Sequence, residues 1–445
     1  MSADHSDIVD PGAGAAGQPG RLPLDGITVM DLSRALAGPY CTALLGDLGA
    51  RIIKVESVKG GDSTRTWPPF EGDHSLYFDS TNRNKESIAV DFYVEEGRTL
   101  LWDLAVSADV LVENFRPGVL ATMGLDPERL REANPGLVIA SVSGFGATGP
   151  LAQAAGLDQV AQGMSGLMSV TGPDADTPTR VGVPVMDLYA GVFAAVGVCA
   201  SLAGRAAHGG RGHQVGTSLL EAGLAVSAFQ GQNYLSTGAV PVPQGNNHPV
   251  LAPYGVFRTA DIPAIIAVGN QAHWKTFCRI LDAPELEHDP RFAIGRDRSE
   301  NREELARLIE ERLQHRPGLE WIEEFRAAGI PTGPIYTYAQ AFEDPQVQAL
   351  QMVQHVQRID GSPLPLLRGP LSVDGVPAGV RKAPPALGED TRAVLERLGL
   401  DEDQIAGLVA AGIVRETTQP DAAQQDPAQQ EAVAQAGAPA GTEHP

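Results

Sequence analysis

The stretch of sequence that decides the fold is ITVMDLSRALAGPYCTALLGDLGARIIKVE, residues 27–56. Two short β-branched runs, 27–32 and 51–55, flank an apolar segment, 40–48, of helical length. A strand–helix–strand unit of this kind belongs to a parallel sheet, and the turn into its helix suits anionic groups. The turn SRALAGP carries one glycine where a dinucleotide fingerprint needs three, so the segment disfavours an NAD enzyme.

Further short β-branched runs continue this pattern along the chain. They lie at 87–92, 109–115 and 137–142, with helical patterns between them. The alternation predicts an α/β fold with a parallel sheet. The loops ENFRPG (113–118) and SGFGATGP (143–150) follow two of these strands, so we expect them at one crevice along the carboxyl edge of the sheet.

Composition places the chain among ordinary globular proteins and excludes several function classes. Of 445 residues, 43% are hydrophobic and 20% charged. Lys+Arg 33 against Asp+Glu 55 gives a net charge of −22, which disfavours nucleic-acid and membrane-surface partners. No stretch approaches ~18 uninterrupted apolar residues, the length of a membrane span. The three cysteines form no C-x-x-C pair, which favours a reducing cytoplasmic location.

The two chain ends and the middle differ from the first part. Residues 1–21 carry acids and no apolar core where a signal peptide would need basic and apolar residues, so we expect a disordered leader. Residues 416–445 are rich in Gln, Ala and Pro, which predicts a disordered tail. A Pro/Gly/Asn stretch at 237–253 marks a boundary, and hairpin-like strands and amphipathic helices after it predict a small α+β domain.

Among the candidate catalytic groups, the carboxylate of Asp187 is the most informative. It ends the extended run VGVPVM and precedes a long apolar helix, so it lies at or near a helix N-cap on a strand-to-helix loop. Two interpretations are open at this point: Asp187 merely caps the helix, or it is an exposed carboxylate nucleophile. Asp158 also opens a helix and has the same two interpretations. No metal-ligating motif and no G-x-S-x-G hydrolase motif occurs.

A resemblance to a known family separates these interpretations. Six segments in the right order and spacing resemble class III CoA-transferases, the CaiB/BaiF family. They are DLSRALAGPYCTALLGDLGARIIKVE (31–56), GDSTRTW (61–67), NRNKESIAVDF (82–92), VENFRPG (112–118), SGFGATGP (143–150) and GVPVMDLYAG (182–191). In that family the aspartate before the long helix is the catalytic nucleophile, and this position is Asp187.

The resemblance implies an architecture and an assembly. It implies a Rossmann-like large domain with a parallel sheet, built from both chain ends, a smaller α+β domain between them, and two protomers threaded into an interlocked homodimer. The predicted domains are the large CoA-binding domain, N-terminal part, at 22–225, the linker and small domain at 226–340, and the return to the large domain at 341–415.

The resemblance also assigns CoA contacts. Arg34, Ala35, Leu36 and Ala37 correspond to the family's first CoA-binding loop, while Val90, Asn114, Phe115 and Arg116 lie along the adenosine and diphosphate path. Two basic residues of the family are replaced here by Ser57 and Thr122. Lys54, Arg83 and Lys85 are candidates to supply the missing charge.

The implied reaction moves CoA from an acyl-CoA, succinyl-CoA by the nearest branch, to a dicarboxylic acid. Asp187 forms the covalent intermediates, and coenzyme A is a substrate, with no permanently bound metal or redox cofactor. We place Arg65 at the distal carboxylate of the acid, since guanidinium binds carboxylate in bidentate fashion, with Trp67 and Tyr77 beside it. A structural ion pair is the other interpretation of Arg65. The covalent intermediates need protection from water, and the loop 244–255 is the candidate cover.

Two alternatives remain beside the transferase. The family's 2-methylacyl-CoA racemases place a histidine before the aspartate of the G-x-D turn, where this chain has Leu157. A non-catalytic acyl-CoA-binding paralogue would keep the CoA loops but would not need Asp187.

Overall fold

The computed structural model describes residues 22–417, so the predicted leader and residues 418–445 of the predicted tail lie outside the described residues. The first two residues assigned to the tail are anchored. Glu416 forms an ion pair with Arg392, and the Thr417 hydroxyl donates to the carbonyl of Leu387. The ordered part of the chain therefore extends at least two residues beyond the predicted boundary.

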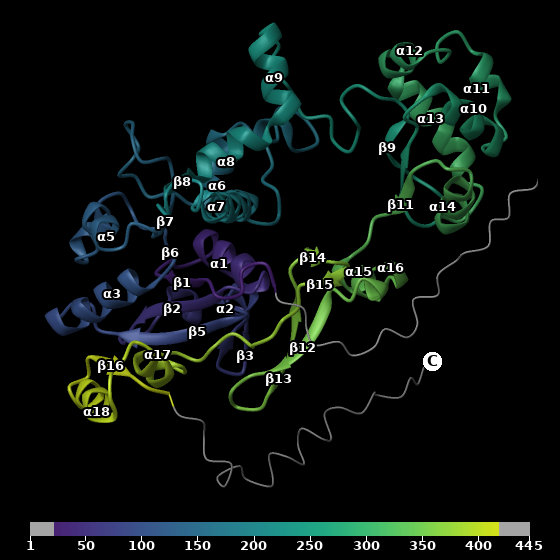
Figure 1. Cartoon of the computed structure of the whole chain (residues 1–445). Helices are drawn as coiled ribbons and strands as arrows, with labels where there is room; N and C mark the ends of the chain where they lie inside the picture. Colours follow the sequence, from purple (N-terminus) through teal and green to yellow (C-terminus); the bar gives the residue numbers. More distant parts are fainter. Residues whose placement is uncertain (1–21, 418–445) are drawn as a thin grey trace, which may run out of the picture.

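A seven-stranded sheet organises the chain (Figure 1). Its strand order is β16 (Val414–Arg415), β5 (Lys85–Val90), β2 (Arg51–Ser57), β1 (Thr28–Asp31), β6 (Val110–Glu113), β7 (Val138–Ser143) and β8 (Gln214–Ser218). All neighbours pair in parallel except β16, which pairs antiparallel with β5. The predicted α/β class with a parallel sheet is confirmed, and all five predicted strands are present.

Helices cover both faces of this sheet. On one face α1 (Ala37–Asp47), α6 (Asp158–Met164), α7 (Val185–Gly204) and α8 (Leu219–Val226) share one hydrophobic core with the strands. On the other face lie α3 (Glu95–Ser107), α4 (Val119–Thr122), α5 (Pro127–Ala133), α17 (Thr391–Arg397) and α18 (Glu402–Ala410). The sheet is thus buried on both sides, which explains its continuous apolar strands.

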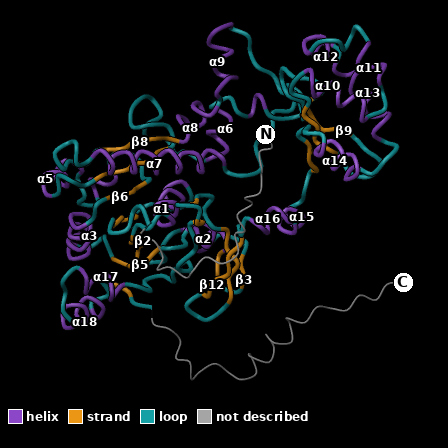
Figure 2. Tube along the Cα trace, turned by 45° about the vertical axis from the view of Figure 1, so that its right-hand side comes forward, coloured by secondary structure: helices purple, strands orange, loops and turns teal. Residues whose placement is uncertain are grey.

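A third hydrophobic core, separate from the two on the faces of the large sheet, lies in the middle of the sequence. Antiparallel strands β9 (Tyr254–Phe257), β10 (Ala264–Ala267) and β11 (Thr332–Pro334) form its sheet. Helices α10 (Gln271–Ile280), α11 (Pro284–His288), α12 (Gly295–Glu300), α13 (Arg302–Leu313) and α14 (Gly318–Ala327) accompany it. This group stands apart from the large sheet in both views (Figures 1 and 2). It falls within the predicted range 226–340, while the domain boundaries themselves stay a prediction.

The C-terminal part of the chain returns to the large sheet. It passes through α15 (Tyr338–Glu343), α16 (Pro345–Ala349), the hairpin β12 (Val353–Gln357) with β13 (Pro363–Leu367), and the small hairpin β14 (Ser372–Val373) with β15 (Val376–Pro377). The Ser87 N–H then donates to Asp390, and β16 closes the sheet beside β5. Residues more than 300 apart in sequence therefore share one core.

Two details differ from the sequence prediction. The sequence of residues 218–234 predicts one long mixed helix, but the structure has two helices there, α8 and α9 (Ala228–Thr237), because Ala228 has a φ of +44° that interrupts the helix. The helix after VGVPVM begins at Val185, with Pro184 as its N-cap. Asp187 consequently lies in the first helical turn rather than on the loop before it.

The helix α7 is long and apolar enough to cross a membrane by length and composition alone. In this structure it packs against α1 and the sheet instead, with Met186, Ala190, Ala194 and Val198 in the core. Its Gly191 allows the crossing, since a Cβ there would lie 2.6 Å from the carbonyl oxygen of Ala37. The crossing brings the start of α7 close to the start of α1.

Candidate active site

A cavity of about 330 Å³ opens at the carboxyl ends of β1, β2 and β6. Its lining combines cationic, aromatic and small polar side chains, among them Ser33, Arg34, Ser57, Phe92, Tyr93, Arg98, Phe115 and Thr122. Concave sites at this edge of a parallel sheet are where such folds bind ligands. The loop 113–118 lines this cavity through Phe115, as predicted, whereas the residues that line it include none of the loop 143–150.

The first predicted CoA loop forms one wall of this cavity. Asn114 holds it, because its amide oxygen accepts from the Arg34 N–H at 2.8 Å and its amide nitrogen donates to the Arg34 carbonyl at 2.6 Å. Ala35 adopts φ +64°, and Leu36 and Ala37 are buried where α1 begins. Asn114 thus fixes the backbone of Arg34, while the Ala35 N–H donates to Asp62 at 3.3 Å.

The other predicted CoA residues differ in exposure. The Arg34 guanidinium lies 5.2 Å from the centre of the Phe115 ring, and both line the cavity. Arg116 is exposed, whereas Val90 is fully buried and accepts a backbone hydrogen bond from Val58. Val90 thus contributes its backbone position rather than a cavity surface.

Sequence reasoning missed three residues at the end of the cavity that Ser57 and Thr122 line. Arg98 and Tyr93 line this cavity, and the Lys59 ammonium lies 5.2 Å from the Tyr93 ring centre. The signal was available, because Tyr93 and Arg98 follow the carboxyl end of a predicted strand. The exposed cations Arg98 and Lys59 therefore lie at the end of the cavity where Ser57 and Thr122 replace basic residues of the family.

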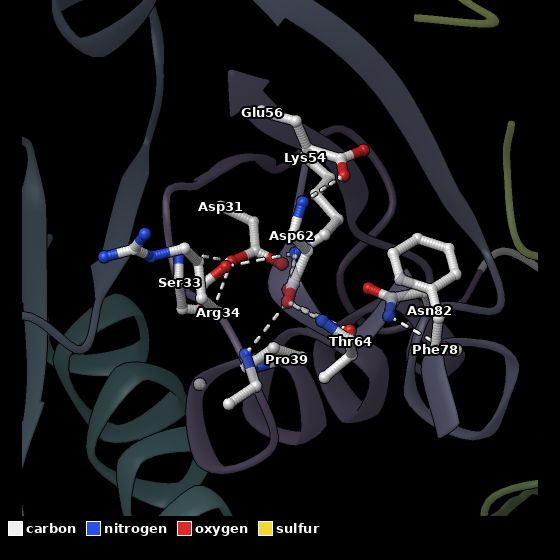
Figure 3. A network of polar contacts seen from close by, with 12 residues as sticks. Asp31, Ser33, Arg34, Pro39, Lys54, Glu56, Asp62, Thr64, Phe78 and Asn82 are labelled. Atoms are coloured by element: carbon white, nitrogen blue, oxygen red, sulfur yellow. Dashed lines mark hydrogen bonds and ion pairs between the residues drawn. The ribbon is translucent and has the colours of Figure 1, made fainter. Parts of the chain in front are cut away.

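A buried ionic network supports the cavity from below (Figure 3). Lys54, fully buried, donates to the Ser33 carbonyl and to Asp62, both at 3.0 Å. Lys85 donates to Asp31 at 3.0 Å, and the Thr42 hydroxyl donates to the same carboxylate at 2.6 Å. Burial alone would raise the pKa of Asp31, but Lys85 and Lys54 outweigh it and lower this pKa to about 2. The start of the predicted CoA loop is therefore supported by buried side chains that stay ionised.

The three lysine and arginine candidates for compensating charge are already paired. Lys54 and Lys85 are bound to Asp62 and Asp31, and Arg83 binds both oxygens of Asp47. Each of the three side chains is at most 4% exposed. The suggestion that they supply charge to a ligand is thus wrong for this structure, because their charge is consumed inside the protein.

Asp187 lies in the first turn of α7 and is partly buried. Burial, followed by the negative charge of Asp158, raises the pKa of Asp187 to about 7. The same two carboxylates act on Tyr77, whose pKa is raised by burial first and then by Asp187 and Asp158. A carboxylate so destabilised in its charged form is a typical catalytic group.

The aromatic residues predicted at the substrate lie on one side of this carboxylate. Trp67 and Tyr77 pack edge to face, with ring centres 5.1 Å apart. Trp67 is 37% exposed, so the pair presents an open aromatic surface. Tyr77 stands in electrostatic reach of Asp187, which brings the predicted nucleophile and one predicted substrate residue together.

Arg65 is engaged within the protein. Its guanidinium binds both oxygens of Glu56, at 2.7 and 2.8 Å, donates to the Pro385 carbonyl and lies 3.7 Å from the Phe78 ring centre. Glu56 is 3% exposed. A substrate carboxylate would have to share or replace this pairing, so the role of Arg65 in acid recognition stays a prediction.

The loop proposed as a cover, 244–255, is tied to the small α+β unit, because the side chains of Arg298, Ser299 and Arg302 donate to the carbonyls of Ala252, Val250 and His248. His248 stacks on Tyr254 with ring centres 4.8 Å apart. The Gly245 N–H donates to the carbonyl of Gly172, which links the loop to the segment that precedes α7. Whether the loop closes over the site stays a prediction. Within residues 22–417, no group of three or more potential metal ligands gathers.

Residues 24–391 match CoA-transferase family III. The chain belongs to this family. The match spans the predicted CoA loop, Asp187, the core that α1 and α7 form on the sheet and the core in the middle of the sequence, so this family III protein is an enzyme of the transferase class.

Two curated relatives and one crystal structure are similar over most of their length. A succinate–glutarate CoA-transferase of Agrobacterium fabrum is 39% identical, covering 84% of this chain and 96% of the relative. An acetyl-CoA:oxalate CoA-transferase of Acetobacter aceti is 42% identical, covering 74% and 85%. The crystal structure of a CaiB/BaiF family protein from Brucella suis has a TM-score of 0.76 at 39% identity, covering 85% and 100%.

The raised pKa of Asp187 predicts a pH-dependent stability difference. The pKa of Asp187 in the folded state, about 7, exceeds the ordinary aspartate pKa of 3.8, so the folded state loses stability as pH rises between these values. Because one pKa unit corresponds to ~1.4 kcal/mol, the ionised Asp187 lowers the free energy of unfolding by at most ~4 kcal/mol. Partial access of solvent to the carboxylate reduces this loss. Asp187→Asn should therefore unfold at a higher temperature than the wild type at pH 8 and at a similar one at pH 4.5. Calorimetry across this pH range measures the difference in melting temperature from the wild type, with the exposed Asp174→Asn as control. A difference for Asp187→Asn that does not change with pH, as expected for the control, would contradict the prediction.

Proposed function

We propose that this family III protein moves CoA from an acyl-CoA, succinyl-CoA in first place, to a dicarboxylic acid through covalent intermediates on Asp187. The observation that carries the proposal is a partly buried carboxylate, with its pKa raised to about 7, beside aromatic side chains in a fold of the CoA-transferase family. The named activities of the two curated relatives support the substrate class.

The reaction proceeds in exchanges that conserve the thioester. An Asp187 carboxylate oxygen attacks the acyl-CoA carbonyl carbon, the C–S bond breaks, and CoA leaves as thiolate with the electron pair. The thiolate then attacks the aspartyl carbonyl carbon of the mixed anhydride and expels the donor acid as carboxylate. The acceptor carboxylate attacks the resulting aspartyl thioester and expels CoA thiolate. That thiolate attacks the acceptor's own carbonyl carbon in the new anhydride, which yields the product thioester and frees Asp187.

The surroundings of Asp187 suit the first step. A carboxylate of raised pKa is more basic, and hence a better nucleophile, than an ordinary solvated aspartate. Its charge disappears on acylation, so the burial that disfavours the free carboxylate favours the covalent form. At neutral pH about half of such a group is ionised, which keeps a reactive fraction available.

The choice of acceptor acid rests on shared chemistry between the relatives. Glutarate and oxalate, the acids in the relatives' names, both carry two carboxylates. A second carboxylate needs a cation, and Arg65 and Arg34 are the candidates nearest the aromatic surface and the CoA cavity. We place Arg65 first because it neighbours Trp67 in the chain and lies on Phe78, next to Tyr77.

The racemase alternative lacks a proton-transfer group at the required position. The residue before Asp158 is Leu157, whose side chain is 70% exposed and has no titratable group. A non-catalytic paralogue would not need a nucleophile of raised pKa, which this chain has.

We further propose that the enzyme is a homodimer. The helix α9 has no buried residue, and three of its large apolar side chains are 51–78% exposed: Phe229, Tyr234 and Leu235. The neighbouring α7 and α8 add exposed Tyr189, Val196 and Leu224. Figure 2 shows α9 projecting from the body of the protein. A short helix without packing is marginal in water, so a second chain that covers this face would stabilise it.

The nucleophile is tested by removing its carboxylate. Asp187→Ala and Asp187→Asn should lower CoA transfer from succinyl-CoA to glutarate by at least ~10³-fold, because no covalent intermediate can form. Hydroxylamine should trap the wild-type intermediate as a hydroxamate on Asp187, which mass spectrometry of peptides locates. Exposed Asp174→Asn is the matched control. Transfer retained in Asp187→Ala would contradict the covalent mechanism.

The role of Arg65 needs a variant that spares the buried Glu56. Arg65→Met alone leaves Glu56 without its bidentate partner and should cost ~3–5 kcal/mol of stability. Arg65→Met with Glu56→Gln removes both charges and should recover most of that loss.

If Arg65 meets the distal carboxylate, the double variant should still lose ~10-fold or more in kcat/KM for glutarate but only a few-fold for butyrate. Steady-state kinetics with both acids measures this. An equal decrease for both acids would make Arg65 a purely structural residue.

The homodimer is tested in solution. Sedimentation velocity should give a mass twice that of the 46.8 kDa chain. Phe229→Asp with Leu235→Asp should shift the protein to monomer, because two charges cannot be buried without partners. Leu319→Asp, at an equally exposed residue of α14, should leave the dimer intact. A wild-type monomer at micromolar concentration would refute the assembly.

A further inference from the structure

Asp158 lies beside the nucleophile and holds the segment that carries it. Its Oδ1 accepts from the Met186 N–H at 2.8 Å, and Met186 precedes Asp187 in the first turn of α7. Its Oδ2 accepts from the Gln162 side-chain amide at 2.7 Å. One carboxylate of α6 therefore caps the neighbouring helix α7 rather than its own.

The position of Asp158 is itself fixed by a close backbone contact. Gly156 packs against Gly144, at the end of β7, so closely that a Cβ on Gly156 would lie 2.3 Å from the Gly144 Cα. The contact ties the start of α6 to the carboxyl end of the sheet. Gln162 extends the link, because its Oε1 accepts from the Val181 N–H at 2.9 Å. The whole approach to Asp187 is thus bound to α6.

We propose that Asp158 is a positioning residue for Asp187: it fixes the first turn of α7 through the Met186 N–H and holds a second negative charge beside the nucleophile. The proposal deepens the proposed CoA transfer and rests on it. The repulsion between the two carboxylates vanishes when Asp187 becomes a neutral anhydride or thioester, so Asp158 favours the covalent forms over the free carboxylate. Both Asp158 oxygens accept hydrogen bonds, so its carboxylate is held in place on both sides.

The elements packed around Asp187 carry a few other titratable side chains, and most of these are buried or bound to a partner. The helix α1 carries Cys41, which is fully buried, Asp47, which is paired with Arg83, and Tyr40. Glu221 on α8 accepts from the Ser218 hydroxyl, and α7 itself carries Tyr189 and Cys199. The strands β7 and β8 carry no titratable side chain. The helix α2 (Leu76–Thr81) adds Tyr77 and Asp79, of which Asp79 is paired with Arg358. Burial comes first and Asp158 second among the causes that raise the pKa of Asp187.

Two variants separate the hydrogen bond from the charge. Asp158→Asn keeps an oxygen for the Met186 N–H and removes the charge. The acid limb of kcat/KM against pH should then move down by on the order of one unit. Asp158→Glu keeps the charge but displaces the oxygen that accepts from the Met186 N–H. It should therefore lower kcat, while the acid limb of the pH profile stays near its wild-type position. Glu221→Gln is the charge control and should leave both unchanged.

A second readout needs no turnover. The melting-temperature advantage of Asp187→Asn at pH 8 over pH 4.5 should shrink when the variant is made in the Asp158→Asn background, because the repulsion is already gone. An undiminished advantage, together with an unmoved acid limb, would reduce Asp158 to a simple cap and overturn the proposal.

The two hypotheses fail differently. Absence of CoA transfer in the wild type with any acid would remove the proposed function, while the stability cycle would still measure coupling between the two carboxylates. If the wild type transfers CoA, but the stability cycle shows no coupling between Asp158 and Asp187 and the acid limb of kcat/KM does not shift, only the role of Asp158 is refuted.

Discussion

The close crossing of α1 and α7 is the constraint on which the site depends. It requires Gly191, where the backbones approach so closely that a methyl group would strike the carbonyl of Ala37. Ala37 is also the first residue of α1 and the end of the first CoA loop. Gly191 follows Asp187 by four residues, so both lie on one face of α7. One helix contact therefore brings the predicted CoA loop and Asp187 to the same edge of the sheet.

The protein combines an acidic surface with internally balanced charge. Its net charge of −22 would repel the anionic substrates that the reaction needs, yet exposed Arg34, Arg98 and Lys59 gather at the cavity. The lysines beneath the loop do not add to this attraction, because Asp31 and Asp62 neutralise them. Long-range charge and local potential are thus separate properties of this chain.

Carboxylates near the site carry out opposite tasks because their partners differ. Asp31 stays ionised between two ammonium groups and serves the scaffold. Burial and the like charge of Asp158 raise the pKa of Asp187 to about 7. Residue type alone does not distinguish the two, since both are aspartates that follow an apolar run of the sequence. The difference lies in which charges the fold places beside each carboxylate.

The sequence by itself determined the parallel sheet, its five first strands and the candidacy of Asp187, because these depend on local periodicity and on short ordered motifs. Only the tertiary structure decided which of those residues are free to act. Arg65 meets Glu56 and Pro385, the last 320 residues away, and Lys54 and Lys85 meet acids that neutralise them. The bond from Met186 to Asp158 joins residues 28 apart through the packing of two helices. Such pairings follow from how strands and helices pack across the sheet, and no local pattern records them, because a side chain's charge and exposure are set by distant neighbours.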